Sequence, residues 1–119
     1  MTVTIVDDDE AVVDSLNALL QSYGFETKGY TSAREFLAQA DGDARCIVVD
    51  MHMPEMNGLE LLNALKSRGE TPRAIMITGR GEVNLPERAA HLGAAHVLRK
   101  PIDAAALISL IRTIVGNDP

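Results

Sequence analysis

Short apolar runs alternate along the 119-residue chain with segments whose apolar residues recur at helical spacing, and this alternation occurs five times. The apolar runs cover residues 2–6, 25–30, 46–50, 74–78 and 95–99. The segments between and after them place leucine, isoleucine or valine at intervals of three and four residues, which is typical of amphipathic helices. The pattern therefore predicts five strand–helix units.

Capping residues and one proline predict where some of these helices begin. Asp9 and Asp103 precede the first and last helices, and aspartate is a favoured N-cap residue. Pro86 falls where a full-length fourth helix would already be running, and proline is tolerated only in the first turn. We therefore expect the fourth helix to begin near Leu85, with Asn84 as its N-cap, and to last about two turns.

The first, third and fourth apolar runs are nearly continuous rather than alternating. Such runs are typical of parallel strands that helices cover on both faces of a sheet. The predicted fold class is therefore α/β, a doubly wound sandwich with a five-stranded parallel sheet. The length suits one domain, and we expect residues 1–119 to form it.

Composition narrows the function classes. The formal net charge is −6, and the absence of a basic run argues against direct nucleic-acid binding. Cys46, the single cysteine, lies in an apolar run, which predicts a core thiol in a reducing cytoplasm. No apolar run approaches the roughly 20 residues of a membrane span, and the acidic start lacks the basic region of a signal peptide. We expect a cytoplasmic protein that does not bind membranes.

Polar residues follow four of the five predicted strands. These are Asp7 and Asp8 after the first strand, Asp50 at the end of the third, Thr78 at the end of the fourth and Lys100 after the fifth. The carboxyl ends of parallel strands meet at one edge of the sheet, where ligands bind in such folds. The sequence therefore predicts one site made from all of these residues.

The predicted site has the chemistry of phosphoryl transfer. Neighbouring carboxylates repel one another, and a hard divalent cation such as Mg²⁺ resolves the conflict. Three carboxylates, Mg²⁺ and Lys100 would sum to zero charge, and carboxylates can serve as phosphoryl acceptors. Adjacent Asp7 and Asp8 can reach a cation together, whereas Asp50 stands alone. We therefore predict Asp50 as the acceptor and Thr78 as a hydrogen-bond donor to the phosphoryl group.

Four short motifs carry a resemblance to a known family. They are Val6-Asp7-Asp8, Val49-Asp50 with Met53-Pro54 and Gly58, Ile77-Thr78-Gly79, and Lys100-Pro101. In this order and at these distances they resemble the receiver domain of two-component response regulators, in particular the nitrogen-fixation (FixJ-like) type. The resemblance covers residues 3–115 and implies a flavodoxin-like (βα)5 fold with strand order 2-1-3-4-5.

The resemblance implies roles for the acidic residues. Asp50 would accept a phosphoryl group from a sensor histidine kinase, and Asp7, Asp8, Asp50 and the backbone carbonyl of His52 would hold Mg²⁺. Pro101 would follow a cis peptide bond that orients the preceding lysine.

The resemblance also implies how the protein acts. It would be a signalling switch rather than a turnover enzyme, catalysing only its own phosphorylation and dephosphorylation. An output domain or downstream protein would receive the signal, and homodimers would form through the fourth helix, fifth strand and fifth helix.

Further positions are implied to bind the phosphoryl group or to modulate the switch. Thr78 would bind the phosphoryl group and move toward it, while Lys100 would pair with one of its oxygens. Val97 stands where the family usually has an aromatic residue that follows the threonine inward, so signal transmission needs another route. Arg80 and His52 occupy the two positions that tune how long the phosphoryl group survives.

Two alternatives stay open. A receiver that has lost its chemistry could act as a protein-interaction module, which the absent aromatic residue favours and the intact set of costly polar groups disfavours. A small phosphatase of the haloacid-dehalogenase type would place its nucleophile on the first strand, where Asp7 and Asp9 have the required spacing. The small-turn residues and the cap of that class are missing.

Overall fold

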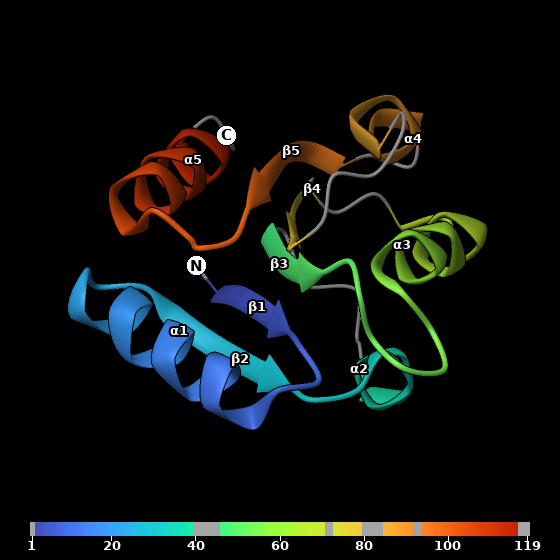
Figure 1. Ribbon diagram of the computed structural model, residues 1–119, viewed down its shortest axis with the longest axis horizontal. Coiled ribbons are helices and arrows are strands. Elements are labelled where there is room, and N and C mark those ends of the chain that lie inside the picture. Colours follow the sequence, from blue (N-terminus) through green and yellow to red (C-terminus); the bar gives the residue numbers. More distant parts are fainter. Residues whose placement is uncertain (1, 40–45, 71–72, 80–84, 92–93, 117–119) are drawn as a thin grey trace.

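The computed structural model describes residues 2–39, 46–70, 73–79, 85–91 and 94–116. Strands and helices alternate through these residues in the predicted order (Figure 1). The strands are β1 (Thr2–Val6), β2 (Glu26–Tyr30), β3 (Cys46–Asp50), β4 (Arg73–Thr78) and β5 (Ala94–Arg99). The helices are α1 (Glu10–Ser22), α2 (Ala33–Gln39), α3 (Gly58–Ser67), α4 (Leu85–His91) and α5 (Ala104–Gly116).

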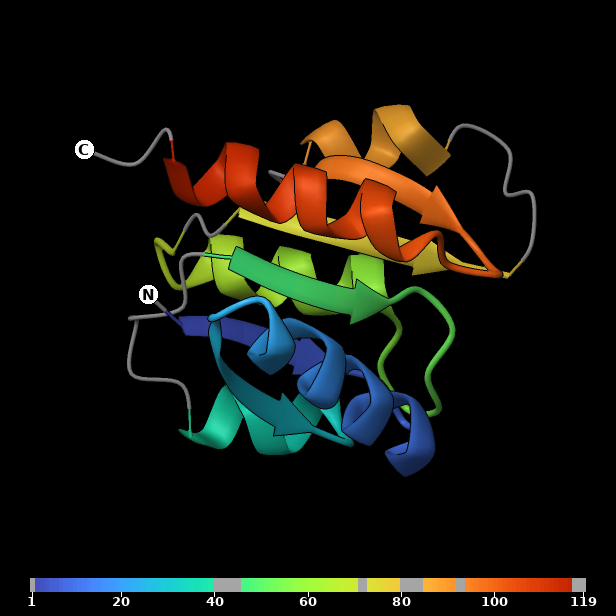
Figure 2. The same ribbon diagram turned by 90° about the vertical axis from the view of Figure 1, so that its left-hand side faces the viewer.

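The strands form one parallel sheet in the order β2-β1-β3-β4-β5, which confirms the predicted topology. Helices α1 and α5 cover one face of the sheet, and α2, α3 and α4 cover the other (Figure 1). Figure 2 shows the strands pointing in a common direction behind α1 and α5. All carboxyl ends therefore open onto one edge of the molecule, the edge that faces the viewer in Figure 1.

The sheet separates two apolar layers, and this explains the continuous apolar runs. One layer joins the sheet to α2 and α3, and the other joins it to α1 and α5. Strand β3 is buried along its whole length. Consecutive residues such as Ile47 and Val48 point to opposite faces of the sheet and belong to opposite layers. Cys46 is fully buried in the second layer, as predicted. Burial of this kind contributes roughly 25 cal/mol per Å² of apolar surface.

The helices begin where side chains can satisfy their free N–H groups. Asp9 Oδ1 accepts the N–H of Ala11 at 3.0 Å, and Asp103 Oδ1 accepts the N–H of Ala105 at 3.0 Å. Both predicted N-caps are confirmed. Helix α4 begins at Leu85, as expected from the proline that follows it. The proposed N-cap of α4, residue 84, lies outside the described residues.

The connection from β3 to α3 is held close to the sheet. The N–H of Met51 donates to the carbonyl of Ile77 at 2.8 Å, and the N–H of Gly58 donates to the carbonyl of Met51 at 3.0 Å. A Cβ at Gly58 would lie 2.9 Å from the carbonyl oxygen of Asp50, which is too close for a backbone atom. Only glycine allows α3 to begin so near the end of β3.

Candidate functional site

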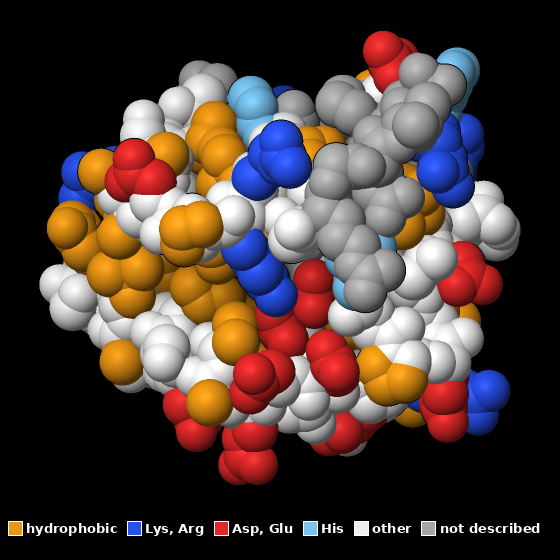
Figure 3. Space-filling view, in the orientation of Figure 1, with side chains coloured by type: hydrophobic (Ala, Val, Ile, Leu, Met, Phe, Trp, Pro, Cys, Tyr) orange, Lys and Arg blue, Asp and Glu red, His pale blue; other side chains and the backbone are white. Residues whose placement is uncertain are grey.

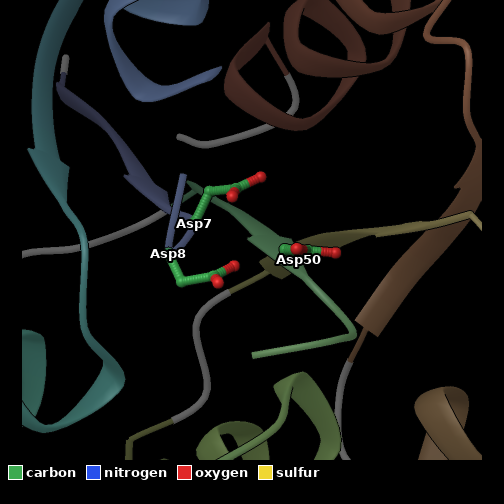
Figure 4. A group of neighbouring side chains, drawn as sticks. All are labelled: Asp7, Asp8 and Asp50. Atoms are coloured by element: carbon green, nitrogen blue, oxygen red, sulfur yellow. The ribbon is translucent and has the colours of Figure 1, made fainter. Parts of the chain in front are cut away.

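The carboxyl ends of β1 and β3 bring three carboxylates together. Asp7, Asp8 and Asp50 each offer an oxygen, and these three oxygens lie within 4.8 Å of one another. Figure 4 shows the side chains leaving the ends of β1 and β3 with their carboxylates directed to the same side. Asp7 and Asp50 are 4% and 5% exposed, whereas Asp8 is exposed. The predicted acidic cluster is therefore present, with two buried members and one at the surface.

The surroundings of Asp7 make its negative charge costly. Burial raises the pKa of the Asp7 carboxyl above its ordinary value of 3.8, and the neighbouring carboxylates of Asp50 and Asp8 raise it further. The N–H of Asp9, which donates to Asp7 Oδ1 at 2.9 Å, and the ammonium of Lys100 lower the same pKa. The pKa of Asp7 is raised on balance, so its negative charge is unfavourable here. A cation placed among the carboxylates would stabilise that charge.

The donor set fits a hard divalent cation. Carboxylate oxygens from Asp7, Asp8 and Asp50 can converge on one ion, and oxygen is the ligand that Mg²⁺ prefers. The three carboxylates and Lys100 leave two negative charges, which a divalent cation balances. Figure 3, which looks onto the strand ends, shows acidic side chains gathered near the middle of this face with a basic side chain beside them.

Asp50 is held from two sides. The N–H of His52 donates to Asp50 Oδ1 at 3.2 Å, and Lys100 Nζ lies 3.7 Å from Asp50 Oδ2. The lysine side chain is 38% exposed, so its ammonium can still turn toward an incoming ligand. The peptide bond between Lys100 and Pro101 is cis, as the resemblance implied.

Thr78 completes the group at the end of β4. It is 2% exposed, and its carbonyl accepts the N–H of Lys100 at 2.8 Å. Its Oγ1 lies 3.3 Å from Nε2 of His52. The backbone pairing of β3, β4 and β5 thus sets Asp50, Thr78 and Lys100 beside one another.

The contact of the His52 ring is the feature that sequence reasoning missed. Sequence reasoning gave no contact to the imidazole of His52, yet His52 is only partly exposed and its ring nitrogen Nε2 lies 3.3 Å from Thr78 Oγ1. The signal was available in the parallel pairing. Asp50 pairs with Ile77, so residues just past Asp50 come to lie near the residue just past Ile77.

The remaining predicted positions are less central. Val97 is partly buried and packs against the apolar layer shared with α2 and α3. Pro101 is exposed. Arg80 lies outside the described residues. The roles suggested for these three positions stay predictions.

Among the residues that the structure describes, no helix combines the length and the apolar character that crossing a bilayer requires.

Comparison with known proteins places the chain among relatives of this architecture. It is 45% identical over 118 residues to the transcriptional regulatory protein FixJ of Azorhizobium caulinodans, covering 98% of this chain and 56% of that protein. The chain thus spans little more than half the length of that relative. The FixJ-N crystal structure superposes with a TM-score of 0.86 at 38% identity, covering 98% of this chain and 94% of the other. The response regulator StyR superposes with a TM-score of 0.90 at 35% identity, covering 97% and 59%.

The family profile described as the response regulator receiver domain matches residues 3–112. This match covers the sheet, the acidic cluster and the threonine and lysine at the ends of β4 and β5. The chain therefore belongs to the response regulator receiver domain family of two-component signalling systems.

Proposed function

We propose that Asp50 accepts a phosphoryl group from a sensor histidine kinase with Mg²⁺ at the acidic cluster, and that this reaction switches the binding of a partner. The observation that carries the proposal is the position of Asp50. Its buried carboxylate shares one cluster with Asp7 and Asp8 and lies 3.7 Å from the ammonium of Lys100.

The proposed step is an in-line displacement at phosphorus. A carboxylate oxygen of Asp50 attacks the phosphorus of the phosphohistidine, an O–P bond forms, and the N–P bond to the kinase breaks. The electron pair of that bond stays on the imidazole of the kinase, which takes up a proton. Asp50 becomes an acyl phosphate, and its later hydrolysis returns the carboxylate and inorganic phosphate.

The chain's own residues supply position and charge for this step. Asp7, Asp8, Asp50 and the backbone carbonyl of His52 would hold Mg²⁺, which supplies neutralising charge to the phosphoryl oxygens. Lys100, whose ammonium lies 3.7 Å from Asp50 Oδ2, would neutralise a further phosphoryl oxygen. The Thr78 hydroxyl donates a hydrogen bond to the bound group.

A single labelling experiment tests the proposal. The purified domain is incubated with a small phosphodonor such as acetyl phosphate and MgCl₂, and its intact mass is measured. We expect one phosphoryl group per chain, no label after chelation of the metal, and no label on Asp50→Asn. Asp14→Asn is the matched control, because Asp14 is an exposed aspartate on α1. Absence of label with acetyl phosphate and with phosphorylated kinase would refute the proposal.

The phosphatase alternative meets a structural obstacle. That chemistry would use Asp7 as nucleophile and Asp9 as the acid, but Asp9 Oδ1 already accepts the N–H of Ala11 as the cap of α1. Phosphate release over many turnovers that depended on Asp7 and not on Asp50 would revive this alternative.

The partners follow from the same proposal. The FixJ relative is a transcriptional regulatory protein, and this chain spans little more than half of it, so an output domain or a separate protein would read the switch. Residues 1–119 would act as one cytoplasmic receiver domain without direct nucleic-acid binding. Homodimers would form through α4, β5 and α5. Sedimentation velocity with and without phosphorylation tests this last point.

A further inference from the structure

His52 touches two parts of the site at once. Its backbone N–H donates to Asp50 Oδ1 at 3.2 Å, while its ring nitrogen Nε2 lies 3.3 Å from Oγ1 of Thr78. The first contact is to the proposed acceptor, and the second is to the hydroxyl that would bind the phosphoryl group. One residue of the β3–α3 loop therefore bridges the two.

The backbone that leads into His52 is fixed, so the ring contact starts from a defined position. The preceding residue, Met51, is buried and donates its N–H to the carbonyl of Ile77 at 2.8 Å. The carbonyl of Met51 accepts the N–H of Gly58 at 3.0 Å. With its backbone anchored at the end of β3, His52 can change its contact with Thr78 chiefly by turning its side chain.

The chemistry of the threonine hydroxyl favours a change of partner on phosphorylation. The hydroxyl carries one proton, and phosphoryl oxygens only accept hydrogen bonds. A hydrogen bond to a charged phosphoryl group is roughly twice as strong as one between neutral groups. The 3.3 Å contact with His52 is at the long end for a hydrogen bond to nitrogen. With Nε2 as the unprotonated ring nitrogen, the hydroxyl donates its proton to the imidazole, and a phosphoryl group on Asp50 would therefore win that proton from the imidazole.

We propose that His52 is a positioning residue: its imidazole holds the Thr78 hydroxyl in the unphosphorylated protein and gives it up when Asp50 carries a phosphoryl group. The inference rests on the proposed function. The imidazole of His52 would thereby report the phosphorylation of Asp50. Val97 cannot do this through the hydroxyl of Thr78, because the valine side chain has no polar group to bind it. The released imidazole changes the surface of the β3–α3 loop.

A double-mutant cycle tests the exchange. The affinity for beryllofluoride, an unreactive phosphoryl mimic, is measured with saturating MgCl₂ for the wild type, His52→Ala, Thr78→Val and the double variant. Since one neutral hydrogen bond contributes modestly to stability, we expect His52→Ala to bind beryllofluoride about two- to tenfold more tightly. In the Thr78→Val background the same change should have no effect. His52→Gln, which keeps a polar group of similar reach, should restore part of the wild-type value.

A spectroscopic reading separates positioning from a merely structural role. The ring resonances of His52 are followed by NMR and assigned by their loss in His52→Ala. We expect beryllofluoride to shift them, and Thr78→Val to shift them in the same direction without any ligand. His96→Ala is the matched control, because His96 is exposed on β5, and its beryllofluoride affinity should equal that of the wild type.

The outcomes discriminate clearly. Equal effects of His52→Ala in both backgrounds, weaker beryllofluoride binding by His52→Ala, or His52 resonances that ignore Thr78→Val would each overturn the inference while leaving the proposed function intact. A wild-type protein that neither binds beryllofluoride nor takes up label would instead overturn the proposed function, and this inference with it.

Discussion

Lys100 and Asp50 face each other across the ends of β5 and β3, with 3.7 Å between the ammonium nitrogen and Oδ2 of the carboxylate. The lysine is fixed at its backbone, where its N–H donates to the carbonyl of Thr78 at 2.8 Å, while its side chain keeps contact with solvent. This combination suits a group that stays beside the acceptor and turns to meet an additional anion. Its partial exposure also means that the resting pair itself contributes little stability.

Removing the ammonium should therefore affect chemistry more than folding. We expect Lys100→Gln to reduce the rate of labelling by acetyl phosphate at least tenfold, since removing one preorganised donor from a transition state costs about 100- to 1,000-fold in rate. Its thermal midpoint should stay close to that of the wild type. Lys66→Gln, which changes an exposed lysine on α3 whose Nζ donates to the carbonyl of His91, is the control. Equal labelling rates for the two variants would contradict the role given to Lys100.

The raised pKa of Asp7 predicts how the metal-free protein responds to pH. A carboxyl whose pKa is higher in the folded state contributes stability below its unfolded pKa, and this contribution is lost as pH rises through the folded pKa. We expect the metal-free wild type to lose thermal stability as the pH rises from 3.8, the ordinary pKa of the group, through the raised pKa of Asp7. Asp7→Asn should lose less and should unfold a few degrees higher at neutral pH, about 2 to 6 °C.

Added MgCl₂ should reverse this order. The cation stabilises only a folded protein that can hold it, so the wild type should gain stability with concentration at neutral pH and Asp7→Asn should gain less. Thermal unfolding by circular dichroism, at several pH values with and without the metal, measures both effects. A metal-free Asp7→Asn variant that is less stable than the wild type at neutral pH would show that the burial cost of this carboxylate has been misjudged.

Gly58 predicts a steric link between folding and chemistry. A Cβ there would meet the carbonyl oxygen of Asp50 at 2.9 Å and the Cα of Met51 at 3.1 Å, and both are backbone atoms. We expect Gly58→Ala to cost about 1 to 3 kcal/mol of unfolding free energy and to slow labelling, because the acceptor must shift. Gly116→Ala, where a Cβ meets nothing within 4 Å, should do neither. Urea unfolding and the labelling assay check the pair.

Cys46 should be chemically silent in the folded protein. Burial raises the pKa of this thiol to about 12, so the reactive thiolate is scarce at any ordinary pH. We expect no reaction with a thiol reagent such as dithiobisnitrobenzoate under native conditions, and one thiol per chain in urea. Rapid native labelling would mean that the layer around β3 opens far more readily than its packing indicates.

Much of the fold could be predicted because local pattern and tertiary structure agree. The continuous apolar run ending at Asp50 became β3 with the predicted bounds, and Asp103 caps α5 as expected. The predicted ends of strands were less accurate where a polar or small residue joins the sheet. Strand β4 begins at Arg73, which pairs with Cys46 although its side chain is exposed, and no apolar pattern marks such a residue.

The sequence could predict which residues form the site, but not how their side chains contact one another. Strand ends place Asp7, Asp50, Thr78 and Lys100 at one edge, and the residue types then suggest the chemistry. The ring contact of His52 was not predicted, because sequence spacing says nothing of where a loop side chain turns. Its contact with the threonine depends on the register of β3 against β4, which is a property of the assembled sheet.

Among the described residues, the helices contribute none of the side chains that meet at Asp50. Asp7, Asp8 and Lys100 all come from strand ends or from the residues just beyond them. Residues that decide which protein docks on a helix are therefore separate from residues that carry the phosphoryl chemistry. Substitutions on the helix surfaces can therefore give such a domain a new upstream or downstream partner without changing the residues proposed for the phosphoryl transfer.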